Sequence, residues 1–213
     1  METERLIEQL AGELQPVRRW RKAGWRATIW LLVVAALITA LVLHFANLAV
    51  FAQRIAAPRV ALDCIATALT GITAVFAAFM LSVPGNSARW MALPLPPFLL
   101  WLGASGLGCL RNGWVNHGAG GMIGESAHCF VFILGASVPL AAALFLTLRR
   151  ARPIAPMPVA VLGLLGVAAI AAFVLQFFHP FDVTAIDLAL HLSAIGIVVL
   201  IGSRFHRPLL AAA

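Results

Sequence analysis

The chain has few charged residues for its length. Of its 213 residues, 11% are charged and 62% are hydrophobic. A soluble domain of this size cannot bury so much apolar surface in one core, whereas lipid covers such surface in a membrane protein. A spanning helix needs roughly 20 mostly apolar residues, so six of them would leave little chain for a soluble catalytic domain. The composition therefore predicts a polytopic membrane protein.

Cysteine and recognisable motifs are also scarce. Three cysteines exclude a disulfide-rich scaffold, although they allow one bridge or a metal site. The sequence has no CxxC or HExxH spacing and no acid and base paired at one depth with catalytic spacing, which argues against a membrane enzyme. The first apolar run begins near residue 27 and is too long for a cleavable signal peptide. We interpret it as a retained helix.

Apolar runs of spanning length occur six times. The predicted spans are 27–46, 60–83, 92–110, 127–148, 158–178 and 185–201. Pro139 predicts a kink in the fourth span. We therefore expect an all-α bundle of six transmembrane helices over residues 27–205, between an N-terminal tail of residues 1–26 and a C-terminal tail of residues 206–213.

The distribution of positive charge predicts the orientation of this bundle. Twelve of the 15 Lys and Arg residues lie in the two tails and in the loops after the second and fourth spans. The other three are Arg54, Arg59 and Arg111. Because positive charge stays on the cytoplasmic side, we expect both termini in the cytoplasm. This topology accounts for the net charge of +7, so we expect no direct nucleic-acid partner.

Thiols, imidazoles and carboxylates gather on the predicted outer side of the membrane. The candidates for a sensor or metal site are Cys129, His179, His128, Cys109, Asp182 and Cys64. Thiolate and imidazole together favour copper or zinc, and thiols facing an oxidising compartment can instead be oxidised or form a disulfide. The alternative left open is that each cysteine packs as a small apolar residue and each histidine caps a helix end.

The N-terminal tail has the pattern of an amphipathic helix over residues 3–15. Four apolar residues share one face, namely Leu6, Ile7, Leu10 and Leu14. The polar face is mostly acidic and includes Glu13, whereas a helix lying on anionic lipid needs basic residues there. We expect this helix to bind a groove on a protein partner, and lying on the membrane is the alternative. The basic and aromatic stretch 18–26 predicts contact with membrane lipid.

Three segments resemble one family of membrane regulators. The tail LIEQLAGELQPVRRWR, the span HCFVFILGASVPLAAALFLTLRRARP and the closing FHPFDV…LIGSRFHR are similar to NrsF-type anti-sigma factors. The resemblance implies a six-span regulator of the bacterial inner membrane that is not an enzyme. Such a protein holds an extracytoplasmic-function sigma factor inactive through its acidic tail helix and releases it on metal or oxidant stress.

The resemblance also implies a sensor pair. Cys129 matches the first family cysteine, whereas His179, followed by Pro180 and Asp182, stands where the second is usual. A Cys129–His179 pair can bind a metal but cannot form a disulfide, which favours coordination of a metal unless Cys109 or Cys64 substitutes.

Two further function classes remain as alternatives. The first is a small transporter or metal permease, but the middles of the predicted spans carry almost no charged residue, which a transport path usually needs. The second is a purely structural membrane subunit without a regulatory partner. Binding of a protein by the tail would distinguish the regulator from both.

Overall fold

The computed structural model describes residues 2–12, 21–112, 123–178, 185–205 and 210. Within these ranges the chain forms helices and no strands, which confirms the all-α prediction. The helices are α1 (Glu2–Gly12), α2 (Ala23–Phe45), α3 (Leu48–Ile55), α4 (Pro58–Leu81), α5 (Leu95–Asn112), α6 (Ile123–Leu148), α7 (Pro156–Leu175) and α8 (Ala185–Arg204), with the 3-10 helices η1 (Ala88–Ala92) and η2 (Arg149–Ala151).

The six predicted spans correspond to α2, α4, α5, α6, α7 and α8. Six segments of the described chain are long and apolar enough to cross a membrane, and the ends of these helices differ from the predicted spans by at most four residues. The third span differs most in form, because the 3-10 helix η1 precedes α5 at its start. The prediction of six helices that are long and apolar enough to span a membrane is confirmed.

Helix α3 was not predicted from the sequence. It occupies the first loop, and its eight residues are too few to span a bilayer. The side chain of Asn47 accepts a hydrogen bond of 3.2 Å from the backbone N–H of Val50 and so caps the start of the helix. The sequence therefore contained a signal for the start of α3, because asparagine is a preferred N-cap residue.

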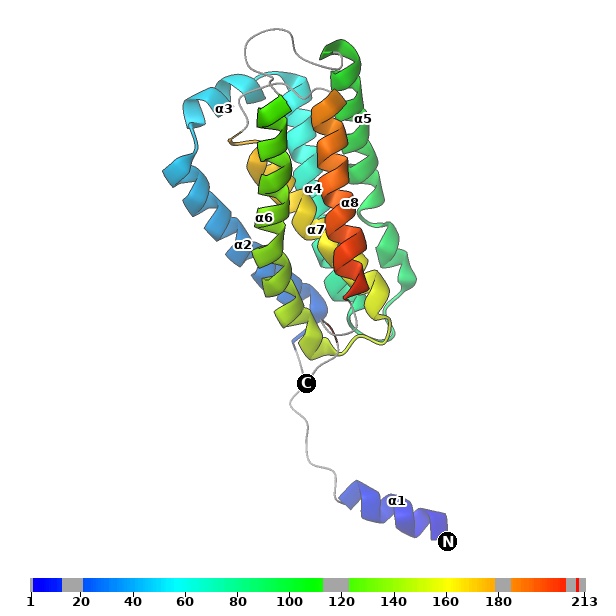
Figure 1. Cartoon of the computed structure of the whole chain (residues 1–213). Helices are drawn as coiled ribbons and strands as arrows, with labels where there is room; N and C mark the ends of the chain where they lie inside the picture. The colour runs from blue at the N-terminus through cyan, green and yellow to red at the C-terminus, as the bar shows by residue number, and fades with distance from the viewer. Residues whose placement is uncertain (1, 13–20, 113–122, 179–184, 206–209, 211–213) are drawn as a thin grey trace.

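The long helices run up and down, and α3 lies across one end of the bundle (Figure 1). We call this end the α3 end and the opposite end, where η1 lies, the η1 end. Helix α7 is central, because 78% of the residues in its apolar stretch are buried, whereas only 17% are buried in the apolar stretch of α2. Figure 1 shows α2 leaving the bundle at an angle, so that it approaches α6 near its own first residues.

Two glycines set the distance between α4 and α7 at the centre of the bundle. A Cβ atom at Gly166 would lie 2.9 Å from the backbone nitrogen of Val75, and one at Gly71 would lie 3.1 Å from the backbone nitrogen of Ile170. Lipid is as apolar as a leucine side chain, so helices in a membrane associate largely through close packing of small residues. The α4–α7 contact therefore requires glycine at these two positions.

This contact generates a stability prediction. The substitution Gly166→Ala should lower the free energy of unfolding by about 1–3 kcal/mol, because the added methyl group meets the backbone of α4, which cannot move aside locally. The matched control is Gly103→Ala in α5, where a Cβ would have nothing within 4 Å. Alanine forms helix better than glycine by about 1 kcal/mol, so the control should be neutral or stabilising. Unfolding of both full-length variants in the same detergent tests this, and equal stability would contradict it.

Candidate functional site at the α3 end of the bundle

The carboxylate of Asp63 is the centre of a buried polar cluster. Asp63 is 6% exposed in the second turn of α4. Its Oδ1 accepts a hydrogen bond from the hydroxyl of Ser105 in α5. Its Oδ2 accepts one of 2.7 Å from Nε2 of Gln176, the residue that follows α7. One carboxylate thus joins three of the long helices, at a depth where ionisable groups are costly and mark candidate functional sites.

Helix α3 is attached to the same cluster. Nη1 of Arg54 donates a hydrogen bond of 3.2 Å to the backbone carbonyl of Gln176. The ring of Phe51 lies against that of Phe177, with 4.3 Å between their centroids. The amide side chain of Gln176 therefore holds Asp63 while its carbonyl holds α3.

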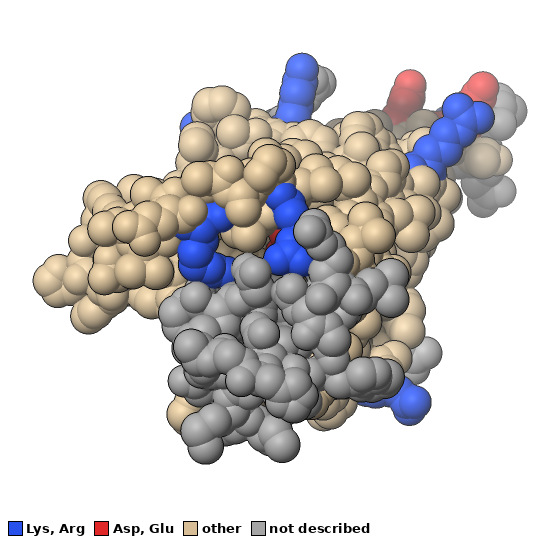
Figure 2. Space-filling view, turned by 90° about the horizontal axis from the view of Figure 1, so that it is seen from above, with Lys and Arg blue, Asp and Glu red and all other residues tan. Residues whose placement is uncertain are grey.

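Basic side chains surround this carboxylate. Arg54 and Arg59 are both half-buried and both act electrostatically on Asp63. In the view onto this end of the molecule, basic side chains flank a hollow (Figure 2). The cluster combines one acid with two guanidinium groups, which lowers the cost of burying each charge.

Local sequence explains where Asp63 lies. Pro58 begins α4, and its fixed φ angle and missing N–H suit the first helical position. The hydroxyl of Thr67 donates a hydrogen bond of 2.6 Å to the backbone carbonyl of Asp63, within the same helix. Asp63 lies in the second turn of α4, beyond the first turn where the helix dipole acts, so its carboxylate depends on the hydrogen bonds from Ser105 and Gln176.

The two described cysteine side chains are buried at separate places. Cys64, 3% exposed, follows Asp63 in α4. Cys129, 6% exposed, lies near the start of α6 in a buried apolar cluster that includes Ala171 and Leu175 of α7 and Ala194 of α8. The structure thus describes Cys129 as part of the contact between α6, α7 and α8.

The other predicted sensor residues are described less fully. His128 is exposed in α6, and Cys109 lies in α5 while its side chain is outside the described part. His179 and Asp182 both lie outside the described residues. Among the residues that the structure does describe, no three or more His, Cys, Asp or Glu side chains are grouped to hold a metal ion. The predicted copper or zinc site stays a prediction.

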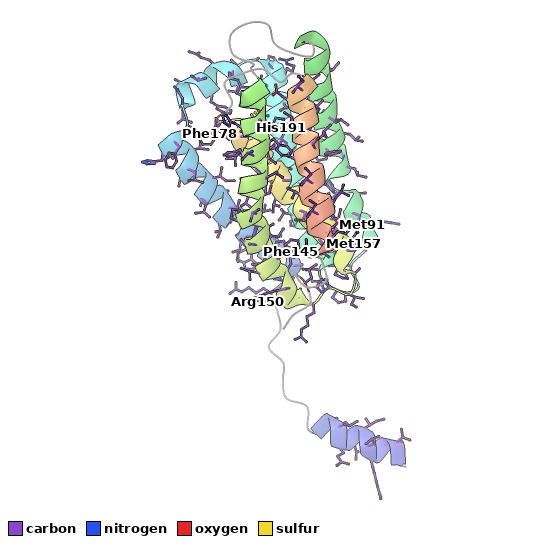
Figure 3. The ribbon with its side chains drawn as sticks, viewed as in Figure 1. Met91, Phe145, Arg150, Met157, Phe178 and His191 are labelled. Carbon is purple, nitrogen blue, oxygen red and sulfur yellow. The ribbon has the colours of Figure 1, made fainter. Side chains whose placement is uncertain are left out.

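A second buried carboxylate lies in α8 at the same end of the bundle. Asp187 is 5% exposed in the first turn of that helix. Nδ1 of His191 (Figure 3) lies 2.6 Å from the backbone carbonyl of Asp187, so this ring is bonded to its own helix. The α3 end therefore gathers the two buried carboxylates that the structure describes.

The apolar face of the tail helix α1 is exposed. Leu6, Ile7 and Leu10 lie on α1 and are 55%, 60% and 56% exposed. Leu14 and Glu13, the remaining predicted partner-binding residues, lie outside the described residues.

Sequence reasoning missed the polar cluster. Asp63 was assigned to the outer side, but it was not chosen as a site residue. The high cost of a carboxylate inside a span is the signal that could have identified it. Its partners Ser105 and Gln176 are 42 and 113 residues away in the chain and belong to no motif, so only the fold reveals them.

Comparison with known proteins gives one family. The model of a family described as NrsF, negative regulator of sigma F, matches residues 10–211. No curated protein and no solved structure matches the chain.

The polar cluster generates a second stability prediction. Replacing Asp63 with alanine leaves the donors of the buried Ser105 and the half-buried Gln176 without their acceptor, at about 1–3 kcal/mol for the buried group and less for the half-buried one. In a double-mutant cycle, Asp63→Ala and Ser105→Ala should be non-additive by about 1 kcal/mol or more.

The measurement is unfolding of the full-length variants in mixed detergent. The control is Ser193→Ala, because Ser193 is exposed and its hydroxyl bonds the carbonyl of Ala189 in its own helix. It should combine additively with Asp63→Ala. Additive behaviour of the Asp63 and Ser105 substitutions would show that their hydrogen bond does not stabilise the fold.

Proposed function

The chain belongs to the NrsF family of negative regulators of sigma F, and we propose that it is an inner-membrane anti-sigma factor for an extracytoplasmic-function sigma factor. Membership of this family implies a regulator that acts on a sigma factor. The proposal adds three things: the type of sigma factor, its binding by the N-terminal tail, and its release on metal or oxidant stress in the periplasm.

The exposed apolar stripe of α1 is the observation that carries the proposal. Leu6, Ile7 and Leu10 form this stripe, and each is more than half exposed. Glu4 and Glu8 lie elsewhere on the helix and are exposed as well. An amphipathic helix of this kind suits a hydrophobic groove on a partner, and its acidic residues favour a groove with a basic rim. The cytoplasmic orientation of both termini, proposed from the charge distribution, gives the tail access to a sigma factor.

Helices α2 and α3 supply a physical connection between the two ends of the bundle. Helix α2 follows the tail in sequence and leads at its other end into α3, which Arg54 and Phe51 attach to the end of α7. Four of the five buried residues of α2, namely Ala23, Ala27, Trp30 and Val34, lie in its first half, and the fifth, Val42, lies near its end. We propose that rearrangement at the α3 end releases α3 and changes the angle of α2, and with it the presentation of the tail.

The proposed signal is a metal ion or an oxidant that acts on the thiols. Cys129 and His179 are the first proposed ligands for copper or zinc, with His128, Cys109, Asp182 and Cys64 as further candidates. Cys129 is buried where α6, α7 and α8 meet, so modification or ligation of its sulfur would disturb the packing of three helices. Such a ligand can shift the equilibrium by its difference in affinity for the two arrangements and by no more.

A transporter is less well supported. The buried carboxylates that the structure describes, Asp63 and Asp187, lie near one end of the bundle rather than along a path through it. The middle of the central helix α7 is apolar, with Val167, Ala168 and Ala171 all buried. A transport path needs polar groups at several depths.

The tail generates the third prediction. The substitution Leu10→Glu should abolish co-purification of the cognate sigma factor, because burying an unpaired charge in an apolar contact costs several kcal/mol. The matched control is Gln9→Glu, which adds the same charge at an exposed position off the stripe and should retain the sigma factor. Both variants should reach the membrane in normal amounts.

Deletion of residues 1–15 should leave the target genes of the sigma factor constitutively expressed. Normal repression by the truncated protein would exclude the tail as the inhibitory element.

The proposed sensor generates the fourth prediction. In a reporter strain challenged with copper, zinc, chromate and hypochlorite, Cys129→Ser and His179→Ala should each blunt the response to metal. The variant His179→Cys should retain it, since both side chains ligate such ions. The control is His44→Ala, because His44 is exposed at the end of α2 and is not among the proposed ligands.

The metal response should also weaken as the pH falls through about 6.5, because imidazole must lose its proton to bind. A response of Cys129→Ser equal to that of the parent for every challenge would reject this sensor.

A further inference from the structure

An apolar groove of about 820 Å³ runs along the bundle between α2, α6 and α7. It exists because α2 leaves the bundle at an angle to α6 (Figure 1). Leu37 and Leu41 of α2 form one wall, and Phe132 and Leu140 of α6 form the other. The lining from Arg26 to Leu41 follows α2 for about 22 Å, at about 1.5 Å for each residue. This length exceeds the roughly 15 Å of hydrocarbon in one leaflet of a bilayer.

The charged residues of the groove are confined to its η1 end. They are Arg26, at the start of α2, and Arg150, in η2 after α6 (Figure 3). Nη2 of Arg26 donates a hydrogen bond of 2.7 Å to the carbonyl of Thr147, and its guanidinium centre lies 5.5 Å from the centroid of the Phe79 ring. These contacts hold Arg26 in a fixed position. Arg150 lies three residues beyond Thr147, is exposed, and acts on Arg26 as a like charge.

We propose that this groove binds one anionic phospholipid, with an acyl chain along the apolar walls and the phosphate at Arg26 and Arg150. The walls match an acyl chain in polarity, and the groove is long enough to hold one. Guanidinium groups bind phosphate oxygens in a forked geometry, and basic pockets between transmembrane helices suit anionic headgroups. A phosphate between two like charges also offsets the repulsion between them.

A second groove supports this choice of ligand by contrast. It lies on the other side of α2, between α2, α4 and α7, has a volume of about 670 Å³, and is lined by apolar residues and threonines without a charged side chain. Both grooves can accept hydrocarbon. Of these two grooves, the one between α2, α6 and α7 combines room for an acyl chain with two guanidinium groups.

The test uses the full-length chain purified in detergent and native mass spectrometry. The protein is titrated with phosphatidylglycerol or with phosphatidylcholine carrying the same acyl chains. Phosphatidylglycerol should bind more tightly. Arg150→Gln should weaken its binding about fivefold, which corresponds to about 1 kcal/mol for one basic residue near an anionic headgroup, and should leave phosphatidylcholine unaffected. The matched control is Arg149→Gln, which removes the same charge one residue earlier, at an exposed position that does not line the groove.

A second variant tests the apolar part of the groove. Ala143 is exposed and lines the groove, so Ala143→Trp should fill the channel and reduce the binding of both lipids. If this variant fails to insert into the membrane, the comparison of Arg150→Gln with Arg149→Gln still decides the proposal.

Several results would overturn the lipid site. Equal affinity of the parent for the two lipids would exclude recognition of the headgroup. Equal loss with Arg149→Gln and Arg150→Gln would indicate diffuse attraction to the basic surface. Displacement of phosphatidylglycerol by inorganic phosphate at equal concentration would indicate a site for a free anion. A chain dimer that excludes lipid would assign the groove to a second copy.

Discussion

The close approach of α4 and α7 at Gly71 and Gly166 is the constraint on which the rest of the bundle depends. The two helices run in opposite directions, so residues before Gly71 and residues after Gly166 lie at the same end. Asp63 precedes Gly71 by about two turns and Gln176 follows Gly166 by about three turns. The glycine contact therefore brings the carboxylate and the amide to hydrogen-bonding distance, and a wider separation of the helices would pull them apart.

The Asp63 cluster adds directional hydrogen bonds to helix packing that is otherwise apolar. Van der Waals contacts between small residues tolerate sliding, whereas a hydrogen bond loses most of its strength when its geometry is disturbed. Asp63 fixes α5 through Ser105 and fixes the end of α7 through Gln176, whose carbonyl in turn binds Arg54 of α3. In a medium of low dielectric such a network is strong while it is complete and costly when one member is lost. This property suits an element with two discrete arrangements.

The sequence predicted the spans well because bilayer thickness imposes their length and the satisfaction of backbone hydrogen bonds imposes their helical form. Neither constraint acts on α3, which is short and lies in a loop, so hydropathy did not reveal it although Asn47 marked its start. The partners of Asp63 were unpredictable for a different reason: the contact of α4 with α7 selects Ser105 and Gln176, and no local pattern encodes it. The Cys129–His179 site stays a prediction, because His179 lies outside the described residues.

The positions of the buried polar residues favour a regulator that transmits a conformational change, rather than a transporter. The buried acids of the described chain lie toward the α3 end, while the centre of α7 is apolar, so a hydrated path through the middle would find little to replace the water shell of an ion. A signal at the α3 end must then reach the tail through movement of helices. Helix α2 is suited to carry this signal. Among the six candidate spans that the structure describes, α2 and α8 have the smallest buried fraction. A helix with few interior contacts moves at low cost, and a small free-energy difference at the α3 end is then sufficient to shift its position.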